Sequence, residues 1–179
     1  MSQELFDELS HEFLTSSSTM AFTQLGLSKS ADSANIRPTA SNPDPLMTVS
    51  EDAPTTPGAR IDARWRLSDL NGAIDTNGWL REWLTHAWIT LIFARWENYY
   101  RPEFAKLEGV ELKKISSDVM GDLRHLRHDI AHCGGVISKD HGVKCKMVTR
   151  FNVGDKIILN PDEIYLLRDS LEVVVDRDE

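Results

Sequence analysis

The chain has 179 residues, of which 41% are hydrophobic, and it carries a formal net charge of −8 at pH 7. This length is sufficient for one domain with a hydrophobic core, and no apolar run approaches the roughly 20 residues of a membrane span. The excess of acidic residues argues against a protein that coats nucleic acid. The chain has only two cysteines and no basic N-terminal signal region, so we expect reduced thiols and a cytoplasmic location.

The charge is distributed unevenly along the chain. It amounts to −6 over residues 1–59, −1 over 60–112, +4 over 113–150 and −5 over 151–179. A basic segment within an acidic protein suits contact with an anion at one site, although a segment of this size also arises by chance. It does not suit tracking along a duplex.

Residues 1–59 are predicted to form a flexible N-terminal arm with a short helix near its start. Leu5, Leu9 and Phe13 recur at a spacing of four, which places them on one face of a helix over residues 3–14. The rest of the arm is rich in Ser, Thr, Ala, Asp and Pro and lacks sustained periodicity, which is typical of a linker. The short helix is either a peptide that docks onto a partner or a frayed terminus.

Residues 60–179 are predicted to form a helical domain, which opens with a short helix over Arg64–Ala73. A long helix then runs over residues 76–100, capped by Thr76 or Asn77. Its apolar residues recur at spacings of three and four: Leu80, Leu84, Trp88, Leu91, Ile92, Trp96 and Tyr99, with Trp79 and Trp83 widening the apolar surface. A helix with so much aromatic bulk serves as core, as a dimer face or as a base-stacking platform.

Pro102 allows a kink or a break after the long helix. The next helix is predicted over residues 110–132, because apolar residues again recur at spacings of three and four: Leu112, Ile115, Val119, Leu123, Leu126 and Ile130. Gly134-Gly135 is a strong signal for its end.

A β-hairpin is predicted next. Residues 144–151 alternate imperfectly between apolar and polar side chains, residues 152–155 have the composition of a turn, and residues 156–159 resume an extended run. Asn160 and Pro161 then open a last helix, whose inward-facing residues are Ile164, Leu167, Leu171 and Val174. The predicted fold is therefore mainly α: a small up-and-down helical bundle with one short β-hairpin before the C-terminal helix.

The residues that suit chemistry lie at the end of the helix over 110–132. Arg127 and His132 are separated by four residues, and His128 lies between them. Arginine binds phosphate through a planar fork of donors, and histidine transfers protons near neutral pH. This combination points to chemistry on a phosphodiester.

The motif Arg127-His128-x-x-x-His132, on the second of two long helices, resembles that of the HEPN superfamily. The run from Ala94 to Tyr100, which contains a Trp-Glu-x-Tyr pattern, also looks like the first long helix of some members. Members are small helical bundles, often dimers, and many are ribonucleases in toxin–antitoxin, antiphage and CRISPR systems. The resemblance covers residues 76–137.

The resemblance implies metal-independent cleavage of single-stranded RNA, with no cofactor, by a bacterial defence or toxin–antitoxin enzyme. Arg127 and His132 would be catalytic, and His128 would orient the site or contact phosphate. Asp129 and Glu97 would be supporting residues that hold an imidazole tautomer. Further contacts with RNA or phosphate are expected from Arg124 and His125. An antitoxin or another partner protein would bind the N-terminal arm.

Helical geometry constrains this hypothesis. Five positions along an ideal helix correspond to a net rotation of about 140°, so Arg127 and His132 do not share a face. Either the helix loosens at its end and lets His132 move, or two copies of the helix pack together and each supplies part of one cleft. The HEPN resemblance implies the second arrangement, which is a homodimer through the helices over 76–100 and 110–132.

Several alternatives compete with a ribonuclease. Arg127 and His132 are also consistent with an exposed helix end, where a cation is favourable. A metal bound by His125, His128 and His132 is disfavoured, because ligands on one straight helix are too far apart along its axis. Cys133 lacks a defined base, so we do not expect it to be a nucleophile. A non-catalytic HEPN-like dimeric binding module and a helical regulatory protein remain as other functions.

Overall fold

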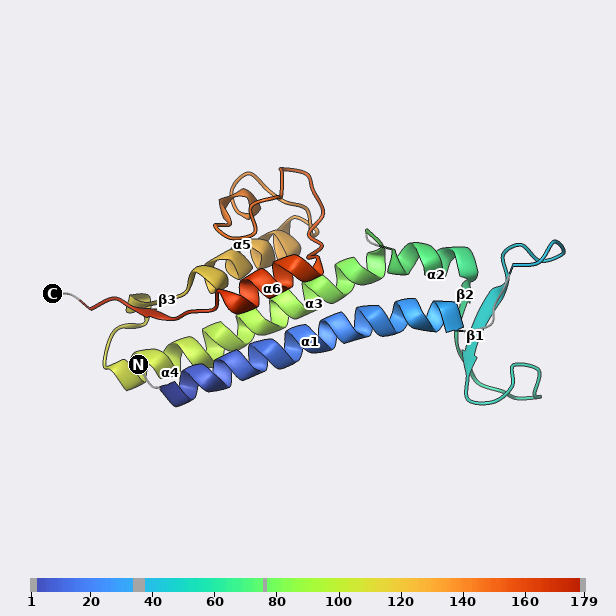
Figure 1. The fold of residues 1–179 in the computed structure, drawn as a ribbon, viewed down its shortest axis with the longest axis horizontal. Helices are drawn as coiled ribbons and strands as arrows, with labels where there is room; N and C mark the ends of the chain where they lie inside the picture. Colours follow the sequence, from blue (N-terminus) through green and yellow to red (C-terminus); the bar gives the residue numbers. More distant parts are fainter. Residues whose placement is uncertain (1–2, 34–37, 76, 178–179) are drawn as a thin grey trace. The chain divides into compact units, whose positions relative to one another are not determined.

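The computed structural model describes residues 3–33, 38–75 and 77–177. The chain is mainly helical, as its sequence predicts, and has two short antiparallel strand pairs (Figure 1). Its contacts divide it into two compact units, one of residues 1–21 with 82–179 and one of residues 22–81. The domain boundary that we expected near residue 60 lies within the second unit.

The elements follow in chain order. They are α1 (Gln3–Ser33), β1 (Leu46–Ser50), β2 (Ile61–Arg66), α2 (Leu67–Ile74), α3 (Trp79–Arg95), a π-helical turn (Trp96–Tyr100), α4 (Arg101–Glu108), a 3-10 turn (Leu112–Lys114), β3 (Ile115–Ser116), α5 (Asp118–His132), a second 3-10 turn (Gly142–Lys144), α6 (Pro161–Asp169) and β4 (Val174–Val175).

Helix α1 is a single helix of 31 residues, and not a short helix at the start of a flexible arm. Leu5, Leu9 and Phe13 are buried, as their spacing predicts. The same face continues with Ser17 and Met20, which are also buried. The prediction of a flexible arm from residue 15 onward is wrong as far as Ser33, where the helix ends. The Ser and Thr residues of this segment are typical of a linker, so the sequence did not indicate that the buried face of the helix continues.

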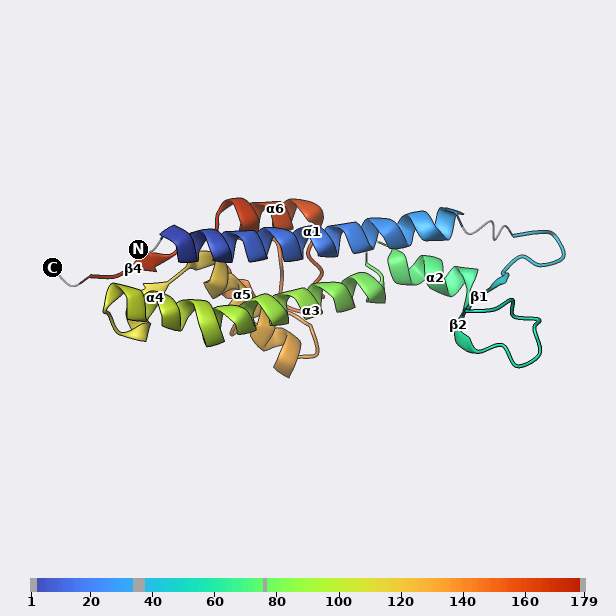
Figure 2. The same ribbon diagram turned by 90° about the horizontal axis from the view of Figure 1, so that it is seen from below.

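The first part of α1 packs antiparallel to α3 and the π turn in the first unit (Figures 1 and 2). The ring of Phe13 meets that of Trp88 edge-on, with centroids 5.2 Å apart. The Arg95 guanidinium donates two hydrogen bonds to the carboxylate of Glu12, at 2.9 and 3.1 Å. The Tyr100 hydroxyl donates to the same carboxylate at 2.5 Å. The N-terminal segment is therefore part of this unit's own core, which leaves little of it free to act as a docking peptide.

Helix α3 continues through the π turn into α4 without a break at Pro102. A π turn widens the helix just before the proline, which accommodates its ring and its missing N–H. Trp88 and Trp96 are buried, whereas Trp79 and Trp83 are exposed. Thr76, one of the two predicted caps, lies outside the described residues.

Helix α5 begins at Asp118, eight residues later than predicted. The Ser117 side chain accepts a hydrogen bond from the amide of Met120 and caps the helix. The residues before the cap belong to β3, which pairs with β4. Val174 is therefore part of a strand and is exposed, and the prediction that it faces inward from a helix is wrong.

The predicted hairpin over residues 144–159 does not form. The run over 156–159 meets residues 135–137 instead, through a single bridge between Val136 and Lys156 and through neighbouring backbone hydrogen bonds. The amides of Lys146, Met147 and Val148 donate to the side chain of Asp122, so they are not available for a strand ladder. The turn at residues 152–155 is confirmed, as is the helix start at Asn160 and Pro161, where Asn160 and Glu163 form a capping box.

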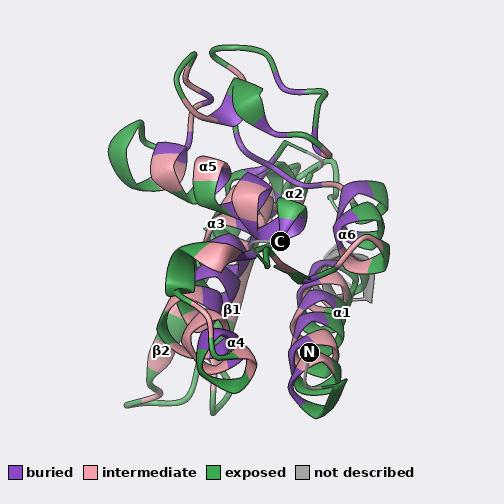
Figure 3. Cartoon of the chain, turned by 90° about the vertical axis from the view of Figure 1, so that its left-hand side faces the viewer, coloured by how far each residue is buried: buried purple, intermediate pink, exposed green. Residues whose placement is uncertain are grey.

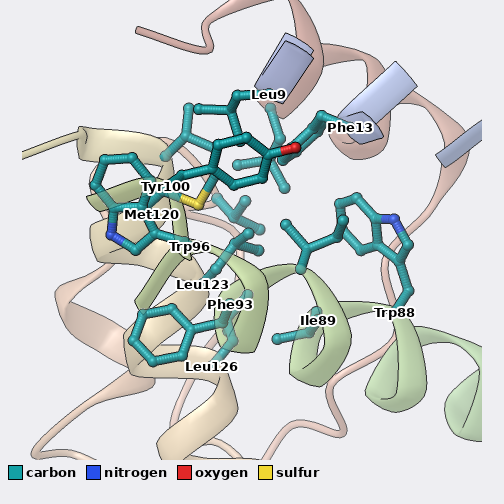
Figure 4. Packing of buried hydrophobic residues seen from close by; sticks show 14 of the residues in the cluster. Leu9, Phe13, Trp88, Ile89, Phe93, Trp96, Tyr100, Met120, Leu123 and Leu126 are labelled. Carbon is teal, nitrogen blue, oxygen red and sulfur yellow. The ribbon is translucent and has the colours of Figure 1, made fainter. Parts of the chain in front are cut away.

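The core of the first unit lies between α1, α3, α5 and α6, whose buried residues face one another (Figure 3). Figure 4 shows part of this cluster, including Trp96, Tyr100, Met120 and Leu123. The helices α3 and α5 run antiparallel. The π turn after α3 lies near the start of α5, because residues of both line one pocket. His86 in α3 contacts the residues after the end of α5.

The second unit contains a β-hairpin and a short helix. Strands β1 and β2 pair antiparallel with Leu46 opposite Arg66 and Val49 opposite Ala63. Helix α2 follows directly and buries Leu67 and Leu70. The helix predicted over Arg64–Ala73 is therefore a strand up to Arg66 and a helix only from Leu67. Among all the described residues, no helix combines the length and apolar character needed to cross a bilayer.

Candidate functional site

The end of α5 is well defined. The helix includes His132, Cys133 is its C-cap, and Gly134 and Gly135 follow with φ of 64° and 77°, as the sequence predicts. A Cβ on Gly135 would lie 2.3 Å from a ring atom of His86, so glycine is needed there for space as well as for its backbone angle. His86 Nε2 also lies 3.1 Å from the carbonyl of Ile157, which fixes this end of α5 against α3 and the chain before α6.

Arg127 and His132 both lie within α5 and are exposed. Because the helix extends through His132, the two residues keep the net rotation of about 140° expected for five positions. The loosened helix end that would bring them together is absent in this structure. Within the described residues, Arg127 makes no hydrogen bond or ion pair. Within one copy, the two side chains of the motif therefore project from different sides of the helix.

Four histidines gather at the last turns of α5 and the loop that follows it. The rings of His128 and His141 are stacked, with centroids 3.5 Å apart and an angle of 23° between their planes. The ring of His132 lies 4.6 Å from that of His128, and the ring of His125 lies 5.7 Å from that of His141. The sequence placed three of these residues on one helix, but it did not single out His141 as part of a site.

The loop that carries His141 is held by Asp129. The Asp129 side chain is fully buried and accepts hydrogen bonds from the Ser138 amide at 2.8 Å, the Ser138 hydroxyl at 2.7 Å and the Gly142 amide at 2.9 Å. Its carboxylate lies 3.7 Å from His128 Nδ1, too far for a hydrogen bond. The hydrogen bonds of Asp129 therefore hold the loop, and its predicted role in holding an imidazole tautomer stays a prediction.

Hydrogen bonds also set the charge of Asp129. Burial alone would raise its pKa, but the donors from Ser138 and Gly142 outweigh burial and hold the pKa below its ordinary value. Asp122, one heptad earlier, is almost fully buried and binds the amides of residues 146–148. Sequence reasoning missed Asp122. The sequence does contain a signal for it, because Asp122 and Asp129 are seven residues apart and lie beside the apolar stripe of α5.

Glu97 lies away from the histidines. It belongs to the π turn and accepts a hydrogen bond from Arg101 at 3.1 Å. It lines a pocket of about 140 Å³ together with Ser117 and Gly121, at the start of α5. The distance from Gly121 to His132 along the helix axis is about 16 Å. Within one copy of the chain, Glu97 therefore lies at the opposite end of α5 from His132, and the role predicted for it in holding an imidazole tautomer stays a prediction.

Of the two predicted phosphate contacts, His125 belongs to the histidine cluster, and Arg124 lines the pocket that also holds Glu97. His125 is half-buried. Burial lowers its pKa, and the positive charges of His141, Arg124 and Lys144 lower it further. Arg124 is exposed and forms no hydrogen bond or ion pair with any residue that the structure describes. The ring atoms Nδ1 of His125 and His128 are buried and have no hydrogen-bond partner there.

Other chemistries receive no support from these residues. No group of three or more His, Cys, Asp or Glu side chains in the described ranges could hold a metal ion. Both cysteines are free, and burial together with the charge of Asp129 raises the pKa of Cys133, which disfavours its thiolate. Burial also raises the pKa of Cys145, to about 12.

Comparisons with protein-family models, with curated proteins and with solved structures find no match to this chain.

Proposed function

We propose that the chain is a metal-independent endoribonuclease of the HEPN type, active in the cytoplasm in a bacterial defence or toxin–antitoxin system. The observation that carries the proposal is the exposed end of α5. There His132 lies beside the stacked rings of His128 and His141, and Arg127, which is exposed and has no ion pair with any described residue, projects from another side of the same helix. Residue types that transfer protons and bind phosphate are thus both exposed near this end of the helix.

The proposed reaction uses the RNA itself as the nucleophile. His132 removes the proton of a ribose 2′-OH, and the 2′ oxygen attacks the adjacent phosphorus. Arg127 stabilises the negative charge that develops on the phosphate oxygens. The bond from phosphorus to the 5′ oxygen breaks, and that oxygen takes up a proton. The products are a 2′,3′-cyclic phosphate and a 5′-OH.

A homodimer supplies the geometry that a single copy lacks. The rotation of about 140° separates Arg127 from His132 within one helix, so Arg127 of one copy would face His132 of the other. Helix α3 offers apolar surface for this contact, since Trp83 and Leu91 are 61% and 56% exposed. We expect light scattering to give twice the mass of the chain. A strict monomer would remove the argument for a composite cleft.

The test is cleavage of a single-stranded RNA in EDTA by the wild type and by the variants His132→Ala and Arg127→Ala. Each variant should lose at least about 100-fold in rate, which is typical for the removal of a general acid–base group. The matched control is His11→Ala, an exposed histidine on α1 that should leave the rate unchanged. Equal rates for all four proteins, or a requirement for a divalent metal, would refute the proposal.

A non-catalytic binding module is the second candidate, and exposed apolar residues of the second unit favour it. Phe22, Leu25, Leu46 and Trp65 are between 41% and 77% exposed. Under this proposal the second unit, and not the first residues of α1, recruits an antitoxin or another partner protein. Trp65→Ala would then reduce partner capture, while the RNA would stay intact with every variant.

A further inference from the structure

The pocket that holds Glu97 lies between the π turn, β3 and the start of α5, all within the first unit. Its volume is about 140 Å³. The apolar side chains that line it are buried and form its floor: Phe93, Trp96, Ile115 and Met120. The charged side chains that line it are more accessible and form its rim: Glu97, Arg101 and Arg124.

Gly121 also lines this pocket, and nothing in its surroundings requires a glycine. It lies within helix α5, where glycine is less favourable than alanine by about 1 kcal/mol. Beyond its chain neighbours and the backbone of its own helix, no heavy atom lies within 4 Å of the place that a Cβ would occupy. An isolated glycine inside a helix usually has a packing or a functional reason. Here the missing side chain leaves open space at the pocket, and the helix is less stable for it.

The size of the pocket suits one ring. An apolar protein cavity of about 150 Å³ holds a benzene molecule, which is close to the volume found here. Two of the floor residues, Phe93 and Trp96, are themselves aromatic, and aromatic rings pack favourably against one another. The floor therefore favours an occupant with one aromatic ring.

The rim carries more positive than negative charge. The Arg101 guanidinium donates one hydrogen bond to the carbonyl of Ile115 at 3.0 Å and one to the Glu97 carboxylate at 3.1 Å. Arg101 is therefore held in place, and Glu97 balances its charge. Arg124 is exposed and has no ion pair with any residue that the structure describes, so one positive charge remains. A carboxylate matches the planar fork of an arginine, so the favoured occupant carries one negative charge.

We propose that this pocket binds a small aromatic monocarboxylate, with its ring against the apolar floor and its carboxylate at Arg124. Gly121 keeps the space for the ring open, and Arg101 with Glu97 forms the fixed side of the rim. The site is independent of the proposed ribonuclease, whose motif lies at the other end of α5.

The probe is sodium benzoate, titrated into the full chain with ¹³C-labelled methyl groups of methionine and isoleucine. We expect the signals of Met120 and Ile115 to shift with one Kd, while the signal of Met20 in α1, outside the pocket, stays in place. Benzyl alcohol has the same ring without the charge. It should bind at least about tenfold more weakly, because a hydrogen bond to a charged group is the stronger kind.

Two variants separate the space from the charge. Gly121→Leu fills the open space and favours the helix, so benzoate should no longer shift the signals while the stability to urea is kept or increased. Arg124→Gln should weaken the Kd of benzoate at least about fivefold and leave that of benzyl alcohol unchanged. Lys113→Gln removes an exposed lysine that does not line the pocket, and this matched control should leave both Kd values as in the wild type.

Several results would overturn the proposal. Signals of Met120 and Ile115 that do not move with benzoate would refute the site. A Gly121→Leu variant that binds benzoate like the wild type, or that loses stability, would show that the space is not open as described. Equal Kd values for benzoate and benzyl alcohol, or for the wild type and Arg124→Gln, would refute the carboxylate. Cleavage of RNA enters none of these outcomes, so the two proposals stand or fail separately.

Discussion

Replacement of Asp129 by alanine should destabilise the first unit strongly. The buried carboxylate accepts three hydrogen bonds, and two of the donors are the backbone amides of Ser138 and Gly142. A hydrogen bond to a charged group contributes about 1.5–3 kcal/mol net, so loss of the two amide partners gives about 3–6 kcal/mol. We expect the free energy of unfolding to fall by about 4 kcal/mol at neutral pH. The measurement is urea unfolding, monitored by tryptophan fluorescence.

The pH dependence adds a second check on the same residue. Since the pKa of Asp129 is held below its ordinary value, its stabilisation is complete above about pH 4 and is lost as the pH falls through the native pKa. The Asp129→Ala variant should lack this part of acid denaturation. Asp140→Ala, an exposed aspartate in the same loop, is the matched control and should cost less than about 0.5 kcal/mol. A loss for Asp129→Ala as small as that of the control would show that the loop is not held as described.

Three further predictions concern the core, the helix end and the histidine cluster. Phe13→Ala should cost about 3–5 kcal/mol in urea unfolding, whereas the exposed Phe22→Ala should cost less than about 0.5 kcal/mol; equal losses would contradict the place of α1 in the core. Gly134→Ala should lower the free energy of unfolding by about 1 kcal/mol, because alanine is strained at a positive φ. Gly135→Ala should lower it clearly more, because its Cβ would also lie 2.3 Å from a ring atom of His86. The pKa of His125 is lowered from its ordinary value of 6.5 in the folded protein. Below about pH 6.5 the unfolded chain therefore binds a proton at His125 more readily than the folded protein does. The free energy of unfolding should decline on acidification for this reason. Urea unfolding of His125→Gln at about pH 7 and about pH 5 should show a smaller decline than the wild type, and an identical decline would count against this burial.

Local signals in the sequence predicted much of the helical framework. The spacing of Leu5, Leu9 and Phe13 identified a buried face, and the pair Gly134-Gly135 marked the end of α5. Asn160 and Pro161 marked the start of α6. Each of these features depends on residues within one or two helical turns, so it can be recognised without knowledge of the rest of the fold.

The features that escaped prediction depend on contacts distant in the sequence. Asp122 binds amides 24 to 26 residues later, and this contact replaces the predicted hairpin. The stack of His141 on His128 requires the loop path that Asp129 holds. Ser17 is buried in the face of α1 although its type is typical of a linker. No local pattern reveals such partners, so the motif residues were predicted but their surroundings were not.

The most direct test of the account is the chemistry of the cut in RNA. A single-stranded RNA incubated with the wild type in EDTA should give fragments that end in a 2′,3′-cyclic phosphate and begin with a 5′-OH. Replacement of the ribose at the cleaved position by a 2′-deoxyribose should abolish that cut and leave the others. Cleavage that continues at the deoxy position, or products with a 5′-phosphate, would contradict attack by the 2′-OH and with it the role proposed for His132.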